Sequence, residues 1–276
     1  MNFFSRLSNG WTLAKTSFQV LNNNKQLIAF PILSGISLIL VIGSFVAAMF
    51  GFGFFDYFFE EGESKIVIYG VTFLFYIINY FIIVFFNTAL IHCAKLYFDG
   101  EQDITVGKGL SFSLSRIGTI FTWAVVAGTV GAILKIIQEE SGLIGKIITG
   151  LIGVVWNVAT FFVVPVMAYE NLSPFAAIKR SSSIMKEKWG ESIGANFSFG
   201  IVQFVLILGA MLVGFIIGAL IHPIAGVIVG VMLAFIIYAV ISASQTIFIC
   251  AVYRNINGSL DEHFSQQMVD ELFQRK

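Results

Sequence analysis

The residue types that most often carry chemistry are sparse in this chain and stand apart from one another. Its histidines are His92, His222 and His263, and its cysteines are Cys93 and Cys250. The sequence contains no CxxC pair, P-loop or HExxH pattern. The spacings typical of a metal site or a phosphate cradle are therefore missing. We expect a protein that is not an enzyme and that needs neither a metal nor a cofactor.

Charged residues are also missing from the middle of every long apolar run. Ion-coupled transporters commonly place an acidic residue at this depth, so the sequence lowers the expectation for that class. Glu170 follows Pro165 at the end of one run. We expect Glu170 to form a structural ion pair with a neighbouring lysine or arginine rather than to act catalytically.

Neutral polar residues do occur inside the runs. Those that could line a polar path are Asn79, Asn87, Asn157, Gln203 and Gln245. Residues of this kind more often form hydrogen bonds between neighbouring helices, which stabilise the bundle by roughly 0.6 kcal/mol each. Packing is the favoured interpretation, and a path for a solute is the alternative.

The composition points to a bilayer as the solvent. Of the 276 residues, 57% are hydrophobic and only 12% are charged, whereas about 25% are charged in an average soluble domain. The mean hydropathy is +0.88. The 16 basic and 16 acidic residues cancel, which argues against a nucleic-acid partner because such proteins carry a basic excess.

Six apolar stretches are long enough to cross a bilayer, for which about 20 residues are needed. They are residues 27–55, 66–93, 117–137, 143–167, 193–221 and 223–252. The sequence thus predicts an all-α integral membrane protein with six transmembrane helices in one domain. With the N-terminus inside, only Lys65, Lys135 and Lys146 fall outside, which leaves 13 of the 16 basic residues inside. The positive-inside rule then predicts a cytoplasmic (inner) membrane and cytoplasmic termini.

The spans read as three helical hairpins, each preceded by a cytoplasmic amphipathic segment. The first segment, residues 1–25, carries an apolar stripe at helical spacing: Phe4, Leu7, Trp11, Ala14, Phe18 and Leu21. The third does the same with Phe175, Ile178, Ser182, Met185 and Trp189, and the second is weaker, with Val106, Leu110, Leu114 and Ile117. Each returning span also ends in a tyrosine, at Tyr97, Tyr169 and Tyr253. This similarity indicates an ancient triplication, although interfacial tyrosines are common at span ends.

Aromatic and basic residues of these segments are candidates for contact with membrane lipid, including anionic lipid. They are Phe4, Trp11, Lys15, Phe18, Lys179, Arg180, Lys186, Lys188 and Trp189. The equally weighted alternative is that the segments pack on the bundle or on a partner subunit. The cytoplasmic tail, residues 254–276, contains a second set of apolar residues that could bind a partner.

Glycines at close spacing predict tight helix contacts. Span five contains Gly214 and Gly218, and span six contains Gly226 and Gly230. Pairs of this GxxxG type allow two backbones to approach closely. The sequence leaves open whether the partner helix belongs to this chain or to a second copy in a homo-oligomer.

Residues 163–191 read VVPVMAYENLSPFAAIKRSSSIMKEKWGE, and residues 251–264 read AVYRNINGSLDEHF. Together they resemble an uncharacterised family of six-span prokaryotic membrane proteins over nearly the whole chain, although Asn255 departs from the family's aromatic pattern. The layout is also loosely similar to the membrane domains of glycerophosphodiester phosphodiesterases. Because no phosphodiesterase domain is attached, that activity does not carry over.

Two functions follow as hypotheses. The first is a non-enzymatic protein that organises lipid or a membrane protein complex. The alternative is a transporter or channel for an apolar or neutral solute. A membrane enzyme would need groups from the cytoplasmic loops, and nothing in the sequence selects among them.

Overall fold

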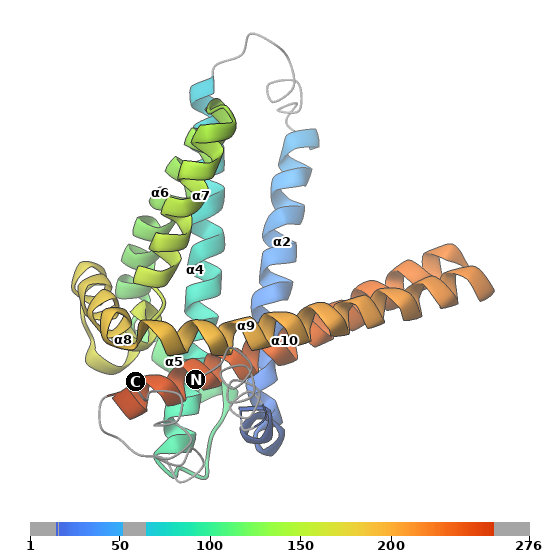
Figure 1. Cartoon of the computed structure of the whole chain (residues 1–276). Coiled ribbons are helices and arrows are strands. Elements are labelled where there is room, and N and C mark those ends of the chain that lie inside the picture. The colour runs from blue at the N-terminus through green and yellow to red at the C-terminus, as the bar shows by residue number, and fades with distance from the viewer. Residues whose placement is uncertain (1–14, 16, 52–64, 257–276) are drawn as a thin grey trace. The chain divides into compact units, whose positions relative to one another are not determined.

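The computed structural model describes residues 15, 17–51 and 65–256, and the side-chain surroundings of these except at 65–67, 187–198 and 255–256. This part of the chain is predominantly helical and contains no strand (Figure 1). Six described segments are long and apolar enough to cross a membrane: Lys25–Gly51, Ile68–Phe98, Ile117–Glu140, Leu143–Glu170, Phe199–Leu220 and Pro223–Arg254. The prediction of an all-helical, multi-pass membrane protein is confirmed at this level.

The helices follow one another with short connectors wherever both ends are described. Their bounds are η1 Lys25–Ile28, α2 Ala29–Gly51, α4 Lys65–Phe98, α5 Val106–Ser115, α6 Ile117–Glu140, α7 Leu143–Ala159, α8 Val163–Glu170, α9 Pro174–Leu220 and α10 Pro223–Ile256. Pro174 and Pro223 each occupy the first position of a helix, where a missing N–H costs no hydrogen bond. At the second of these starts, the Ile224 amide donates to Nδ1 of His222 at 3.3 Å.

The fourth apolar stretch is not the single helix that its composition predicts. It breaks between α7 and α8, over residues 160–162. Pro165 has no N–H to donate to the carbonyl of Phe161, so the helix cannot continue regularly through this point. The Phe162 amide instead donates to Oγ of Ser181 at 3.0 Å, so a serine of α9 supplies one of the partners that the break removes.

The third amphipathic segment and the fifth span also differ from expectation, because they form one helix. α9 runs without interruption from Pro174 to Leu220 over 47 residues. The sequence between them contains glycine but no proline, and glycine weakens a helix without blocking it.

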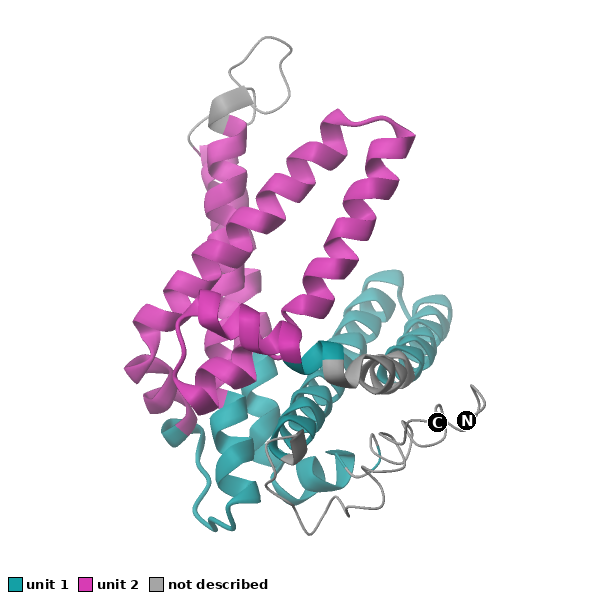
Figure 2. Ribbon diagram, turned by 60° about the vertical axis from the view of Figure 1, so that its left-hand side comes forward, with its two compact units in different colours: residues 1–32, 90–108, 184–276 teal, residues 33–89, 109–183 magenta. Residues whose placement is uncertain are grey.

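The chain divides into two compact units, coloured separately in Figure 2. Unit 1 comprises residues 1–32, 90–108 and 184–276, and unit 2 comprises residues 33–89 and 109–183. The boundaries fall inside α2, α4, α5 and α9.

Unit 2 is organised around the outer part of α4. Gly128 of α6 lies directly on Ile77 of α4, and Phe45 of α2 meets Phe75 of α4 with ring centroids 5.1 Å apart. α6 and α7 are joined by residues 141–142, and Trp123 and Trp156 stack between them at 6.0 Å. Aromatic rings and close glycine contacts therefore hold this helix group together.

The best-buried part of unit 1 lies where the start of α2 and the ends of α4 and α10 come together. The fully buried residues there are Leu27, Phe30, Leu90, Cys93, Ala94, Ala243, Ile247, Cys250 and Tyr253. The thiol of Cys250 donates to the Ile91 carbonyl at 3.6 Å. Both cysteines are buried and neither forms a disulfide, so they act here as small packing residues.

Candidate functional site

The start of α9 turns one face outward and buries the opposite one. Phe175 is 70% exposed, and Lys179, one turn later, is exposed as well. Ala177 and Ser181 lie on the other side and are 0% exposed. Residues four apart share a helix face, so each pair defines one side of the helix. The small residues pack against the protein, whereas the phenyl ring and the ammonium group face the surroundings.

This arrangement differs from the predicted apolar stripe of the third segment. Phe175 is exposed, whereas Met185 of the same stripe is 3% exposed. The buried face instead follows Ala177 and Ser181, because small residues let two helices approach most closely. Lys186 is exposed, and the side chains of Lys188 and Trp189 lie outside the described surroundings.

The short helix α5 shows the same preference. Gly109 and Ser113 are buried, and the Ser113 hydroxyl donates to the Phe85 carbonyl of α4 at 2.8 Å. Leu114 is 57% exposed. The guanidinium group of Arg116 lies 5.5 Å from the centre of the Phe112 ring. α5 therefore also packs through small residues and presents an apolar side chain outward.

The first segment is described only from its last turns. Phe4 and Trp11 lie outside the described residues. Lys15 is exposed, whereas Phe18 is half-buried with its ring 6.1 Å from that of Phe199 in α9. Val20 is 1% exposed. These turns pack on protein through their apolar side, which is the alternative to lipid contact that the sequence leaves open.

Glu170 forms the predicted ion pair. Its Oε1 accepts a hydrogen bond from Nε of Arg180 at 3.1 Å. The pair is partly exposed, so it contributes less than about 1 kcal/mol to stability. Arg180, expected from the sequence to meet lipid, directs its charge toward this carboxylate.

A second ion pair ties α10 to α4 in unit 1. Arg254 donates to the carboxylate of Asp99. Its side chain is 12% exposed, and its guanidinium group lies 5.7 Å from the centre of the Phe98 ring. The end of α10 is therefore positioned by charge and by an aromatic ring together.

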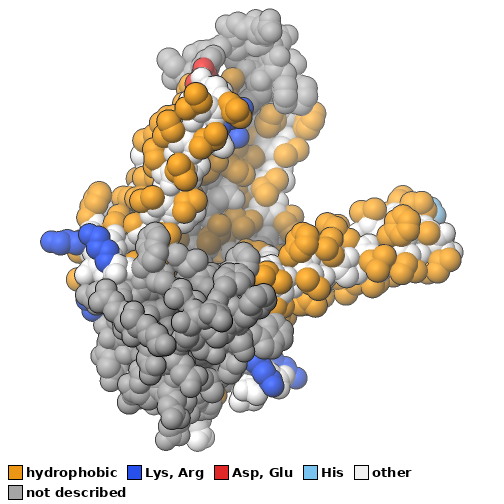
Figure 3. All heavy atoms as spheres, in the orientation of Figure 1, with side chains coloured by type: hydrophobic (Ala, Val, Ile, Leu, Met, Phe, Trp, Pro, Cys, Tyr) orange, Lys and Arg blue, Asp and Glu red, His pale blue; other side chains and the backbone are white. Residues whose placement is uncertain are grey.

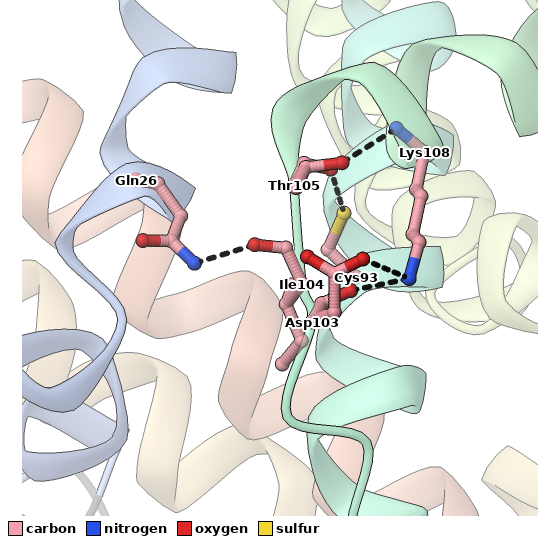
Figure 4. A network of polar contacts seen from close by, with 6 residues as sticks. All are labelled: Gln26, Cys93, Asp103, Ile104, Thr105 and Lys108. Carbon is pink, nitrogen blue, oxygen red and sulfur yellow. Dashed lines mark hydrogen bonds and ion pairs between the residues drawn. The ribbon is translucent and has the colours of Figure 1, made fainter.

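The connector between α4 and α5 is held by polar contacts, drawn in Figure 4. The Gln26 amide donates to the Ile104 carbonyl at 2.7 Å, and the Cys93 thiol donates to the Thr105 carbonyl at 3.5 Å. Lys108 contacts the same connector through its backbone and its side chain. These contacts secure a backbone segment, and Cys93 takes part as a structural donor.

The five residues of the predicted polar path are distributed over four helices. Asn79 and Asn87 lie half-buried on α4, and the Asn79 amide donates to the carbonyl four residues earlier at 2.7 Å. Asn157 is exposed on α7. Gln203 of α9 and Gln245 of α10 are half-buried in unit 1. Three belong to unit 2 and two to unit 1, and a path through them stays a prediction.

Within unit 1, the glycines of α9 and α10 bring the two backbones into contact. A Cβ atom added at Gly226 would lie 2.3 Å from the Gly214 carbonyl oxygen and 2.5 Å from Cα of Gly218. A Cβ at Gly214 would lie 2.9 Å from Cα of Gly230. The two GxxxG pairs thus meet within one chain, and a homo-oligomer stays a prediction.

A groove runs beside this glycine contact. Its volume is about 530 Å³, and its lining is Met211, Gly214, Phe215, Gly218, Ala219, Pro223, Gly226, Val227, Gly230 and Val231. Every lining side chain is apolar or is a glycine hydrogen. The glycine spacing indicates the helix contact, but not the groove, because the groove depends on how the two helices are rotated.

Among residues 15, 17–51 and 65–256, no three His, Cys, Asp or Glu side chains gather in a way that could hold a metal ion. No curated protein matches the chain. The looser resemblance to phosphodiesterase membrane domains stays a prediction. Residues 66–261, more than half of the chain, match DUF6159, a family of unknown function. The match begins near the start of α4 and extends past the end of α10. The chain therefore belongs to the DUF6159 family.

Proposed function

We propose that this protein is a non-enzymatic organiser of membrane lipid or of a membrane protein complex. The observation that supports it best is the outward face at the start of α9. Phe175 is 70% exposed beside the exposed Lys179, while Ala177 and Ser181 are fully buried opposite. The protein contacts are made by small residues, and the side chains suited to a membrane interface remain available.

A phenyl ring and an ammonium group on one helix face match the two layers of a membrane interface. The ring gains by entering the boundary of the acyl chains, and the cation gains by meeting anionic headgroups. A basic residue close to an anionic surface contributes about 1 kcal/mol to binding. α5 offers the same kind of face with Leu114, which is 57% exposed. The proposed partner is therefore lipid, with an anionic component.

The proposal includes three helical hairpins, with these segments on the cytoplasmic side of a cytoplasmic (inner) membrane. The tight connectors at 141–142 and 221–222 support two of the hairpins, and the Phe45–Phe75 contact supports the first. The bias of lysine and arginine supports cytoplasmic termini. Labelling of Glu61→Cys in intact cells with a membrane-impermeant maleimide tests this orientation, and protection of that cysteine would reverse it.

Native mass spectrometry of the protein released from its own membrane tests the lipid role. The double variant Phe175→Ala, Lys179→Ala should retain several-fold less anionic phospholipid than the unmodified chain, in line with ~1 kcal/mol for the lost charge. Lys135→Ala is the matched control, because Lys135 is also exposed but pairs with Glu139. Equal retention by all three proteins would reject the face at the start of α9 as a lipid contact.

The transport alternative is supported by a different observation, the break in the fourth span at residues 160–162. Interrupted membrane helices line the substrate site in many transporters. Here, however, Ser181 bonds the freed Phe162 amide, and the Ser182 hydroxyl faces the Ala159 carbonyl at 3.4 Å. The break is therefore closed by protein, which favours a structural role. Uptake of small neutral solutes into proteoliposomes above the protein-free background would favour transport instead.

A further inference from the structure

The groove beside the glycine contact has a floor that cannot be filled from within the helix pair. Gly214 and Gly226 touch backbone to backbone, so no side chain can grow from either residue into the groove. Protein interiors leave few voids larger than a water molecule, because empty space forfeits contact energy. A groove of about 530 Å³ lies within the roughly 300–1,000 Å³ range of small-molecule sites.

The walls of the groove are apolar and open to the outside. Met211 and Phe215 of α9 are 61% and 74% exposed, and Val227 and Val231 of α10 are 66% and 63% exposed. Orange hydrophobic side chains cover most of the surface of α9 and α10 that Figure 3 shows. Both helices belong to the membrane-spanning segments, and theirs are the two highest hydropathies of the six, 2.6 and 2.8. The surroundings of the groove are therefore hydrocarbon.

The shape favours a single chain over a helix as the occupant. The trough between two touching helices narrows toward its floor. A helix from another copy is about 10–12 Å wide with its side chains, so it would rest on the rims and leave the floor empty. From Met211 to Ala219 the trough is ~12 Å long at 1.5 Å per residue. A flexible hydrocarbon chain can lie along that length and contact the glycines.

We propose that this groove binds one acyl chain of a membrane phospholipid. The lining offers no polar side chain, so the site selects for hydrocarbon and leaves the headgroup outside. The inference does not depend on the proposed lipid contact at the start of α9, because the groove lies near the other end of that helix.

Photocrosslinking of the full chain in nanodiscs tests the site. The probe is phosphatidylcholine with a diazirine midway along one acyl chain, and peptide mass spectrometry locates the adducts. Adducts are expected to concentrate on Met211, Phe215, Val227 and Val231. Ala219→Trp places an indole in the groove and should lower these adducts about tenfold, the equivalent of ~1.4 kcal/mol of binding. Leu212→Trp is the matched control, because Leu212 is 60% exposed and is not part of the lining.

Three results would overturn the proposal. Even labelling of Leu212 and the groove would show ordinary boundary lipid only. Disulfide-linked dimers formed by Ala219→Cys would show that a second copy fills the groove, and adducts confined to other segments would show that the same chain covers it. If Ala219→Trp misfolds, the variant Ala219→Phe and the labelling pattern of the unmodified chain still test whether the groove binds an acyl chain. Phosphatidylcholine carries no net charge, so a negative result in this experiment does not contradict the anionic-lipid proposal. Loss of the anionic-lipid contact would likewise not contradict the groove.

Discussion

The α9–α10 contact of unit 1 and the α4–α6 contact of unit 2 both use glycine, but in different ways. In unit 1, Gly226 faces backbone atoms of Gly214 and Gly218. In unit 2, a Cβ at Gly128 would lie 3.0 Å from Cγ1 of Ile77 and 3.1 Å from its Cα. In the first contact an added Cβ meets bare backbone at 2.3–2.5 Å, and in the second it meets both the side chain and the backbone of one isoleucine at 3.0–3.1 Å.

This difference determines how each contact responds to an added atom. A side chain can rotate or shift by a few tenths of an ångström, whereas a helical backbone moves only together with its whole turn. Unit 2 also has aromatic rings and serine hydroxyls between its helices. The lining of the α9–α10 groove has neither a hydroxyl nor an amide. We therefore expect the α9–α10 contact to depend more strongly on its glycines.

The largest effect is expected for Gly226→Ala. Its methyl group would lie 2.3 Å from a carbonyl oxygen, so α9 and α10 must separate. A destabilisation of roughly 3 kcal/mol or more is expected, at the upper end for overpacking. Thermal melting in detergent measures it. Gly209→Ala is the control, because nothing lies within 4 Å of its added Cβ. Equal melting temperatures for the two variants would contradict the backbone contact.

Gly128→Ala should have an intermediate effect of about 1–3 kcal/mol. The methyl group meets both the side chain and the backbone of Ile77. Combination with Ile77→Val removes one methyl group from the crowded side chain and should recover part of the loss. The same melting assay applies. A loss as large as that of Gly226→Ala would remove the distinction between the two contacts.

Ser181→Ala tests whether serine hydroxyls, in addition to glycine contacts, stabilise the helix packing of unit 2. It would remove the 3.0 Å hydrogen bond to the buried Phe162 amide, and the loss of such a bond costs about 0.5–1.5 kcal/mol. Ser182→Ala is the matched control, because its hydroxyl contact at 3.4 Å is long and therefore weak. Hydrogen exchange over residues 159–166 should increase in the first variant and not in the second.

The smallest effect is expected for Gly70→Ala in α4 and Gly150→Ala in α7. Neither added Cβ would meet an atom within 4 Å. Alanine is the better helix former by about 1 kcal/mol, so melting temperatures should stay constant or rise slightly. A marked fall in the melting temperature of either variant would indicate a partner that occupies that helix face in the membrane.

Much of the architecture follows from the sequence because it depends on local composition. Long apolar runs predict six membrane-crossing segments, since a bilayer demands about 20 such residues irrespective of what surrounds them. The neighbourhood of Glu170 and Arg180 predicts their ion pair for a similar reason, because ten residues of chain keep the two charges close. Pro174 and Pro223 likewise begin helices wherever the helices are placed.

The rotation of each helix is what only the tertiary structure decided. An apolar stripe predicts an inward face in water, but in a membrane apolar side chains are stable on either side. Packing could therefore select Ala177 and Ser181 and leave Phe175 outside. The same freedom places Gly214 against Gly226 and opens the groove beside them. Composition determined that these helices are long and apolar enough to cross a membrane, and the close approach of small residues decided which faces meet protein.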